Sequence, residues 1–183
     1  MSKAVMLSVR PKWCEKIISG EKTVEVRKNR PKLETPFKCY IYETQGWVEK
    51  DGIMAFRLGG RVIGEFTCDR IYKIDKDSTD FLFKAGGLSV YKQAAEEKCD
   101  LRVAMTDDEL HGYLGHYQGY GWHISNLKIY DTPKELIEFH TWKKCKSCSK
   151  SGYESTACIY DENCMIPAAI TKAPQSWCYV EAM

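Results

Sequence analysis

The hydrophobic positions near the start of the chain predict a short helix. Trp13, Ile17 and Ile18 would lie on one face of a helix over residues 11–19 and form an apolar stripe there. A proline at the first position favours a helix start, because its missing N–H would have no partner there. Gly20 follows, and glycine commonly ends a helix in the left-handed conformation. We therefore expect the chain to change direction at this residue.

The segment after this helix alternates as a half-buried strand does. Val24 and Val26 alternate with polar residues. Glu25 and Arg27 therefore share the face opposite the valines, and the long side chain of Lys22 can lean over the same face from the turn. Three charged groups are thus expected to converge beside the end of a helix. The plain alternative is an ion pair on the rim of a sheet, which contributes only about 0–1 kcal/mol when exposed.

The later patterns predict more strands than helices. Thr106 and Glu109 form a capping-box pattern at the start of one helix, and Gly64 marks a bulge or corner inside a long strand. Without a regular alternation of strand and helix, we expect a small mixed α+β fold and no parallel sheet. Strands are expected over residues 38–43, 61–72 and 122–130, a hairpin or irregular connection over 45–60, and helices over 81–83, 91–98, 106–117 and 132–139.

Composition places the chain among globular proteins. Its 183 residues are 44% hydrophobic and 28% charged, which allows one domain with a sizeable core and an appendage. No apolar run approaches the roughly 20 residues of a membrane span, and the start of the chain is too short in apolar residues for a secretory signal. We expect a cytoplasmic protein with no membrane partner, in which the nine cysteines are thiols or metal ligands.

Charge is distributed unevenly along the chain. The net charge is only +2, but residues 1–32 hold nine basic side chains against three glutamates. A basic end on an otherwise slightly acidic chain indicates an anionic partner near Lys22, Glu25 and Arg27, or simply a solvated basic surface. The run over residues 27–32 is expected to be exposed in both cases.

The spacing Gly20-x-Lys22-x-x-Glu25-x-Arg27 resembles the GxKxxExR signature of the ASCH domain, a branch of the PUA-like superfamily. The segments 7–13, 60–66 and 121–130 resemble further strands and the first helix of bacterial and phage-borne members, so the likeness covers about residues 4–140. It implies a small mixed PUA-like β-barrel with flanking helices as a domain over residues 1–140. Residues 141–183 are expected to form a cysteine-rich tail.

The resemblance implies binding of nucleic acid, most simply RNA or a nucleotide-like ligand, in a cleft bordered by the motif. The basic side chains would meet phosphate and Glu25 would orient them or accept a hydrogen bond from a base. Aromatic side chains would stack on bases, unless they belong to the core. The expected binding residues are Lys22, Glu25, Arg27, Arg10, Lys12, Tyr120, Trp122 and His123.

Two other functions fit the same family. One branch resembles an amidohydrolase that removes the acetyl group of N4-acetylcytidine; its lysine matches Lys22, but its threonine falls on Glu25. A hydrolase, including a ribonuclease, would use Lys22 and Glu25 as catalytic residues, with His123 as an acid. The other function is a non-catalytic module that binds protein partners.

The tail predicts a second kind of site. The spacing C-x2-C-x9-C-x5-C gives four thiols, the number that a tetrahedral structural zinc needs. Either His140 or Cys178 could replace one ligand, and reduced cysteines packed without metal are the alternative. The expected zinc ligands are Cys145, Cys148, Cys158 and Cys164, whereas Cys14, Cys39, Cys68 and Cys99 are expected in the core.

Overall fold

A computed structural model describes residues 2–50, 52–74, 101–115, 118–144 and 165–183. The helices expected over residues 81–83 and 91–98, and the four predicted zinc ligands, lie outside these ranges, so the zinc site stays a prediction. The elements are β1 (Lys3–Val9), α1 (Pro11–Ile18), β2 (Val24–Arg27), β3 (Phe37–Glu43), β4 (Gly46–Lys50), β5 (Ile53–Arg57), β6 (Arg61–Cys68), β7 (Ile71–Ile74), α4 (Asp107–Leu114), β8 (Gly119–His123), β9 (Ser125–Lys134), the 3-10 helix η1 (Leu136–Glu138), β10 (His140–Lys144), β11 (Met165–Ala169) and β12 (Trp177–Glu181).

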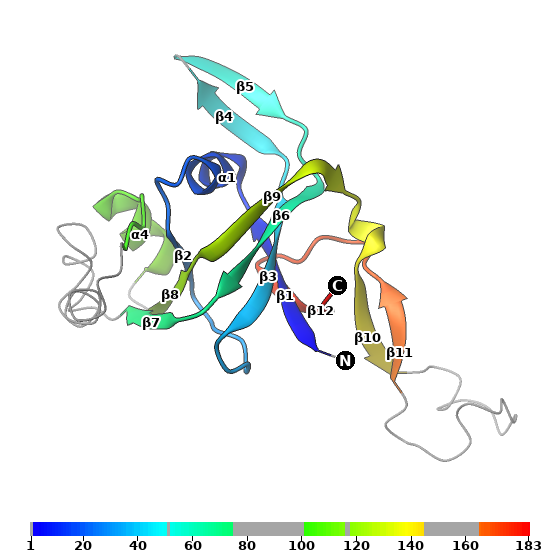
Figure 1. The fold of residues 1–183 in the computed structure, drawn as a ribbon. Coiled ribbons are helices and arrows are strands. Elements are labelled where there is room, and N and C mark those ends of the chain that lie inside the picture. Colours follow the sequence, from blue (N-terminus) through cyan, green and yellow to red (C-terminus); the bar gives the residue numbers. More distant parts are fainter. Residues whose placement is uncertain (1, 51, 75–100, 116–117, 145–164) are drawn as a thin grey trace, which may run out of the picture.

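The described strands form a five-stranded sheet, a three-stranded sheet and two hairpins (Figure 1). The larger sheet has the order β12-β1-β3-β6-β9, in which β1 and β3 are parallel and the other neighbours antiparallel. The smaller sheet has the order β2-β8-β7, and the hairpins are β4-β5 and β10-β11. The mixed α+β class expected from the sequence is confirmed. Among the described residues, no helix is both long enough and apolar enough to cross a membrane.

The described residues form three buried hydrophobic clusters, and two of them border the α1–β2 connection. One contains Leu7, Ile41 and Phe66 of the larger sheet and is closed by Ile17 of α1 and by Trp122 of β8. The other lies between the smaller sheet and α4. Because each buried side chain of this size contributes about 1.5–3 kcal/mol, the two clusters fix the position of the α1–β2 connection between them. The cysteines expected in the core are buried where the structure describes them, namely Cys14, Cys39 and Cys68.

Short-range sequence patterns correctly predicted α1, β2 and the start of α4. Gly20 has a φ of +76° and ends the turn after α1. The Thr106 hydroxyl accepts a hydrogen bond of 3.2 Å from the backbone N–H of Glu109, whose carboxylate accepts one of 3.0 Å from the backbone N–H of Thr106. The capping box is therefore confirmed. The helix ends at Leu114, with Gly115 as its C-cap, earlier than expected.

Three expected elements differ from the structure. The strand expected over residues 61–72 is divided into β6 and β7, and the strand expected over 122–130 is divided between β8 and β9. The helix expected over 132–139 is wrong: β9 continues through Pro133 and only the short η1 follows. A proline is tolerated there because β9 is at the edge of its sheet.

The end of the predicted tail contributes to the larger sheet. β12 pairs antiparallel with β1, and Tyr179 lies opposite Val5. The boundary expected between residues 140 and 141 therefore does not separate this strand from the sheet. The segment before β12 reaches the α1–β2 region, since the Ser8 hydroxyl donates a hydrogen bond of 2.6 Å to the carbonyl of Pro174.

Candidate functional site

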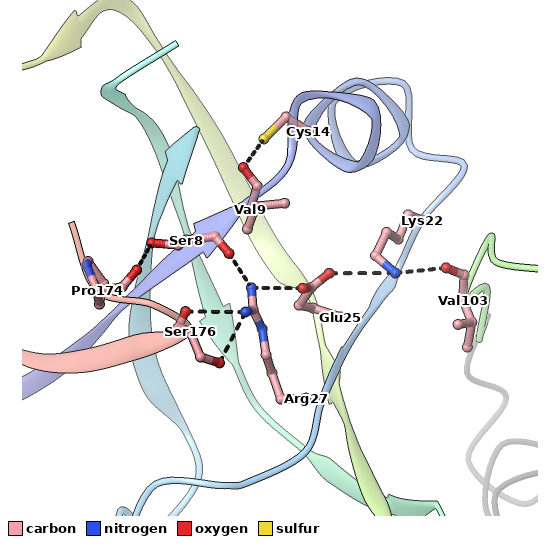
Figure 2. Close-up of polar contacts among 9 residues, drawn as sticks. All are labelled: Ser8, Val9, Cys14, Lys22, Glu25, Arg27, Val103, Pro174 and Ser176. Carbon is pink, nitrogen blue, oxygen red and sulfur yellow. Dashed lines mark hydrogen bonds and ion pairs between the residues drawn. The ribbon is translucent and has the colours of Figure 1, made fainter. Parts of the chain in front are cut away.

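The α1–β2 connection brings three charged side chains together in the interior (Figure 2). Lys22, Glu25 and Arg27 are only 2%, 6% and 5% exposed. One Glu25 oxygen, Oε1, lies 2.9 Å from Arg27 Nη2, and the other, Oε2, lies 3.5 Å from Lys22 Nζ. The convergence expected from the alternation in β2 is present, but the group is buried and is not an exposed ion pair. Each charge therefore depends on its partners.

Arg27 joins three separate parts of the chain. Its Nη2 atom donates a hydrogen bond of 2.9 Å to the carbonyl of Ser8 at the end of β1. Its Nη1 atom donates to the carbonyl and hydroxyl oxygens of Ser176, at 3.2 and 3.3 Å. Figure 2 shows the guanidinium between these acceptors and Glu25. Arg27 thus fixes the segment before β12 against β1 and β2, and its burial corrects the expectation that residues 27–32 are all exposed.

Lys22 connects the same group to the segment before α4. Its ammonium donates a hydrogen bond of 2.8 Å to the carbonyl of Val103 and lies 5.1 Å from the centre of the Trp13 ring. Burial lowers the pKa of Lys22, and the nearby Glu25 carboxylate opposes this change. The lysine therefore has a carboxylate, a carbonyl and an aromatic face around its charge, an arrangement that can hold a desolvated cation.

A cavity of about 660 Å³ lies beside the three charged residues. Its walls come from the end of β1, the first turn of α1, β2 and the residues after it, α4, and the segment before β12. Among the charged residues of the described lining, basic ones are in excess: Arg10, Lys12, Lys22, Arg27 and Lys28 against Glu25 and Glu109. Such an excess of positive charge attracts anions such as phosphate.

The rim of the cavity combines exposed cations with aromatic rings. Lys12 pairs with Glu109 of α4 at 2.6 Å and lies 4.2 Å from the centre of the Trp13 ring. Lys28 lies 5.6 Å from the centre of the Tyr113 ring. Burial raises the pKa of Tyr113, although Arg27 opposes the change, so the phenol stays neutral near pH 7. A neutral ring beside cations is a suitable surface for a nucleic-acid base.

The structure brings together five of the residues expected to bind nucleic acid and separates the other three. The residues that line the cavity are Arg10, Lys12, Lys22, Glu25 and Arg27. Trp122 is fully buried in the core, and Tyr120 packs against the same cluster. His123 lies opposite Val24 in the β2–β8 ladder, on the face away from Glu25, and its Nδ1 atom is 2.6 Å from Asp69. None of these three side chains lines this cavity, so their expected stacking role stays a prediction.

Sequence reasoning missed the contribution of α4 and of the segment before β12. Tyr113, Gln175 and Ser176 all line the cavity. Gln175 is exposed, and its side-chain amide makes no hydrogen bond to the described residues. Ser176 belongs to the site because it contacts Arg27, which lies 149 residues earlier in the chain. Residue spacing within one segment cannot indicate a contact between segments so far apart in the sequence.

Comparisons with known proteins identify the family. The model of the ASCH domain matches residues 7–105. Two similar solved structures are a tyrosine-to-phenylalanine mutant of the ASCH protein from Zymomonas mobilis (20% identity, TM-score 0.51, 74% of this chain and 77% of that chain) and the unmutated protein (19% identity, TM-score 0.49, 73% of each chain). None of the curated proteins matches the chain. The mutant structure supports a shared fold, and the family match covers more than half of the sequence, so the chain belongs to the ASCH domain family.

Proposed function

We propose that this protein binds single-stranded RNA, or a nucleotide-like ligand, in the cavity beside Lys22, Glu25 and Arg27. The observation that carries this proposal is the basic lining of a cavity of about 660 Å³. This volume lies within the roughly 300–1,000 Å³ of ordinary small-molecule sites, so a nucleotide has the appropriate size. Membership of the ASCH family, in which nucleic-acid binding is an expected role, agrees with the proposal.

The buried and the exposed cations of the cavity have different tasks in this proposal. Lys22 and Arg27 already donate to Glu25 and to backbone carbonyls. They hold the walls in position and contribute positive potential. Arg10, Lys12 and Lys28 lie at the rim with their charges closer to solvent. Phosphate contacts therefore fall to these three side chains, and Tyr113 supplies the ring on which a base stacks.

Hydrolysis is less well supported than binding. Both carboxylate oxygens of Glu25 face cations, at 2.9 and 3.5 Å. These contacts occupy both oxygens, whereas a general base needs an oxygen within hydrogen-bond reach of the proton that it removes. His123 lies on the other face of the β2–β8 ladder. The catalytic roles expected of Lys22 and Glu25 therefore stay predictions, as does a non-catalytic role in binding protein partners.

The proposal is tested with rim cations, because these can be removed without exposing a buried charge. Binding of a short single-stranded RNA of mixed sequence is measured by fluorescence anisotropy at several salt concentrations. Lys28→Ala should weaken binding and reduce the salt slope by about 0.7 for each lost phosphate contact. Arg30→Ala is the matched control, since Arg30 is exposed on the same segment but does not line the cavity.

Two results would overturn the proposal. The first is a wild-type protein that binds neither the RNA nor a single nucleotide at low salt. The second is an equal effect of Lys28→Ala and Arg30→Ala, which would indicate a general attraction to basic surface and no use of the cavity. Arg10→Ala provides a second rim position, so the conclusion does not depend on one side chain.

A further inference from the structure

The cavity beside Lys22, Glu25 and Arg27 has two carboxylates in its described lining, and they differ in what they can still bind. Glu25 is 6% exposed, and its two oxygens face Arg27 and Lys22 at 2.9 and 3.5 Å. The side chain of Glu109, on α4, is 35% exposed. Glu109 is therefore the carboxylate of this pair that a ligand in the cavity can reach.

Two hydrogen bonds hold the Glu109 carboxylate in place and leave part of it free. Its Oε1 atom accepts one of 2.6 Å from the Lys12 ammonium, and its Oε2 atom accepts one of 3.0 Å from the backbone N–H of Thr106. These contacts hold the pKa of Glu109 below its usual range, so the group is ionised near pH 7. Because an ionised carboxylate has about four acceptor positions and no donor, about two positions remain, and only a hydrogen-bond donor can use them.

The face of α4 that lines the cavity places Glu109 beside Tyr113. The two residues are four positions apart in this helix, and at this spacing the Cβ atoms lie about 5–6 Å apart. Gly112, on the same face, also lines the cavity. Outside its chain neighbours and the α4 backbone, no described atom lies within 4 Å of the position that a Cβ on Gly112 would take. The surface between the carboxylate and the ring is therefore open.

The spacing of these two side chains matches the way a nucleotide is built. In the proposed function, a base stacks on Tyr113, and Arg10 and Lys28 are among the cations that contact phosphate. The sugar is bonded directly to the base, so it lies within about one helical turn of the Tyr113 ring, next to Glu109. A phosphate is disfavoured at this place, because its charge has the same sign as that of the carboxylate. The hydroxyl groups of the sugar are neutral donors, and carboxylates bind such groups in other nucleotide sites.

We propose that Glu109 accepts a hydrogen bond from the ribose 2′-hydroxyl of a bound nucleotide and thereby selects RNA over DNA. This selection rests on the proposed function, since a nucleotide must first occupy the cavity. The 2′-hydroxyl is the group that distinguishes the two nucleic acids. DNA lacks it, and therefore leaves the carboxylate without a donor and close to phosphates of the same charge. A hydrogen bond to a charged group changes affinity by about 10- to 100-fold.

Fluorescence anisotropy with three short single strands of one sequence tests this role: RNA, DNA in which deoxyuridine replaces thymidine, and RNA whose 2′-hydroxyls are methylated. The wild-type chain should bind RNA about tenfold or more tightly than the other two strands. Glu109→Gln keeps an acceptor for the Thr106 N–H. It should reduce the preference for RNA by about threefold or more, because a neutral acceptor makes a hydrogen bond roughly half as strong. Glu109→Met has no acceptor and should abolish the preference.

Glu138→Gln is the matched control for these variants. Glu138 also closes a capping box, because its Oε1 atom accepts a hydrogen bond of 2.7 Å from the backbone N–H of Glu135. It does not belong to the described lining of the cavity, so the change should leave the preference for RNA unaltered. Circular dichroism checks that each variant keeps its fold.

Three results would overturn the role of Glu109. The first is equal binding of RNA and methylated RNA by the wild-type chain. The second is an equal rise in affinity for RNA and DNA in Glu109→Gln, which would leave the carboxylate a purely repulsive role. The third is a preference for bases with amino groups that is the same in RNA and DNA, which would place a base at Glu109. A wild-type chain that binds none of the three strands would instead refute the proposed function, and the selection with it.

Discussion

Replacing Glu25 by glutamine is expected to destabilise the fold strongly. The carboxylate lies 2.9 Å from Arg27 Nη2 and 3.5 Å from Lys22 Nζ, and all three side chains are buried. The neutral amide of glutamine keeps the shape but removes the only acidic group of this cluster. Two cations then remain in the interior without a counter-charge, where a lost partner costs far more than it does at the surface.

The size of the effect follows from the burial. Removing one partner of a buried ion pair costs about 3–5 kcal/mol, a large part of the roughly 5–15 kcal/mol that stabilises a typical domain. Lys22→Met should cost less, about 1–3 kcal/mol, because Glu25 keeps Arg27 as its counter-charge, although Glu25 Oε2 and the Val103 carbonyl both lose the Lys22 ammonium. The double variant should be more stable than the sum of the two changes predicts, by about 0.5–3 kcal/mol, because the residues are coupled.

Urea unfolding followed by tryptophan fluorescence measures these free energies, since Trp122 lies in the core. Glu34→Gln is the control: this carboxylate is exposed, so the change should stay within about 0.5 kcal/mol. A loss of less than about 1 kcal/mol for Glu25→Gln, with an unchanged slope, would refute the claim that the cluster depends on this charge. RNA binding by Glu25→Gln is informative only under conditions where the variant is folded.

Two further predictions concern the rim of the cavity. The hydrogen bond from Lys12 and that from the Thr106 backbone hold the pKa of Glu109 below its usual range. Glu109→Gln should therefore lower the free energy of unfolding at about pH 6, and this difference should vanish as the pH falls through the folded-state pKa of Glu109; a constant difference would contradict the pairing. Gln175→Ala should reduce any preference among the four homopolymer RNAs by about tenfold or more, as expected for a lost bidentate contact. Gln118→Ala, exposed outside the cavity, should not change it.

Short-range patterns in the sequence predicted the parts of the fold that short-range forces determine. The helix start at Pro11, the alternation of β2 and the capping box of α4 each depend on residues close together in the chain, and all three are present. The apolar stripe expected on α1 is present only in part, because Ile17 is buried but Ile18 is 46% exposed. The helix predicted over residues 132–139 is wrong because a long-range contact determines the structure of this segment. Pairing with β6 holds β9 extended, although the local sequence suits a helix. Tertiary contacts override local preference in such segments.

In the candidate site, too, short-range patterns predicted some features correctly, whereas other features depend on contacts between distant segments. Alternation placed Lys22, Glu25 and Arg27 together, but it did not reveal their burial, which depends on α4 and on the segment before β12. The aromatic residues were chosen for their type, and the structure places Trp122 in the core and Tyr113 at the cavity. Only the packing of distant segments distinguishes a ring in the core from a ring available to a ligand.

The pairing of β12 with β1 has a consequence for how this protein is made and divided. β1 leaves the ribosome early and β12 leaves it late, so a nascent chain holds Arg27 without Ser176 for most of its synthesis. A fragment cut at the limits of the family match, residues 7–105, would lack this acceptor permanently. It would also lack residues 3–6 of β1 and all of β12 and β9, and the open edges left on β3 and β6 would favour aggregation. Expression designs for this chain should therefore retain the residues up to Glu181.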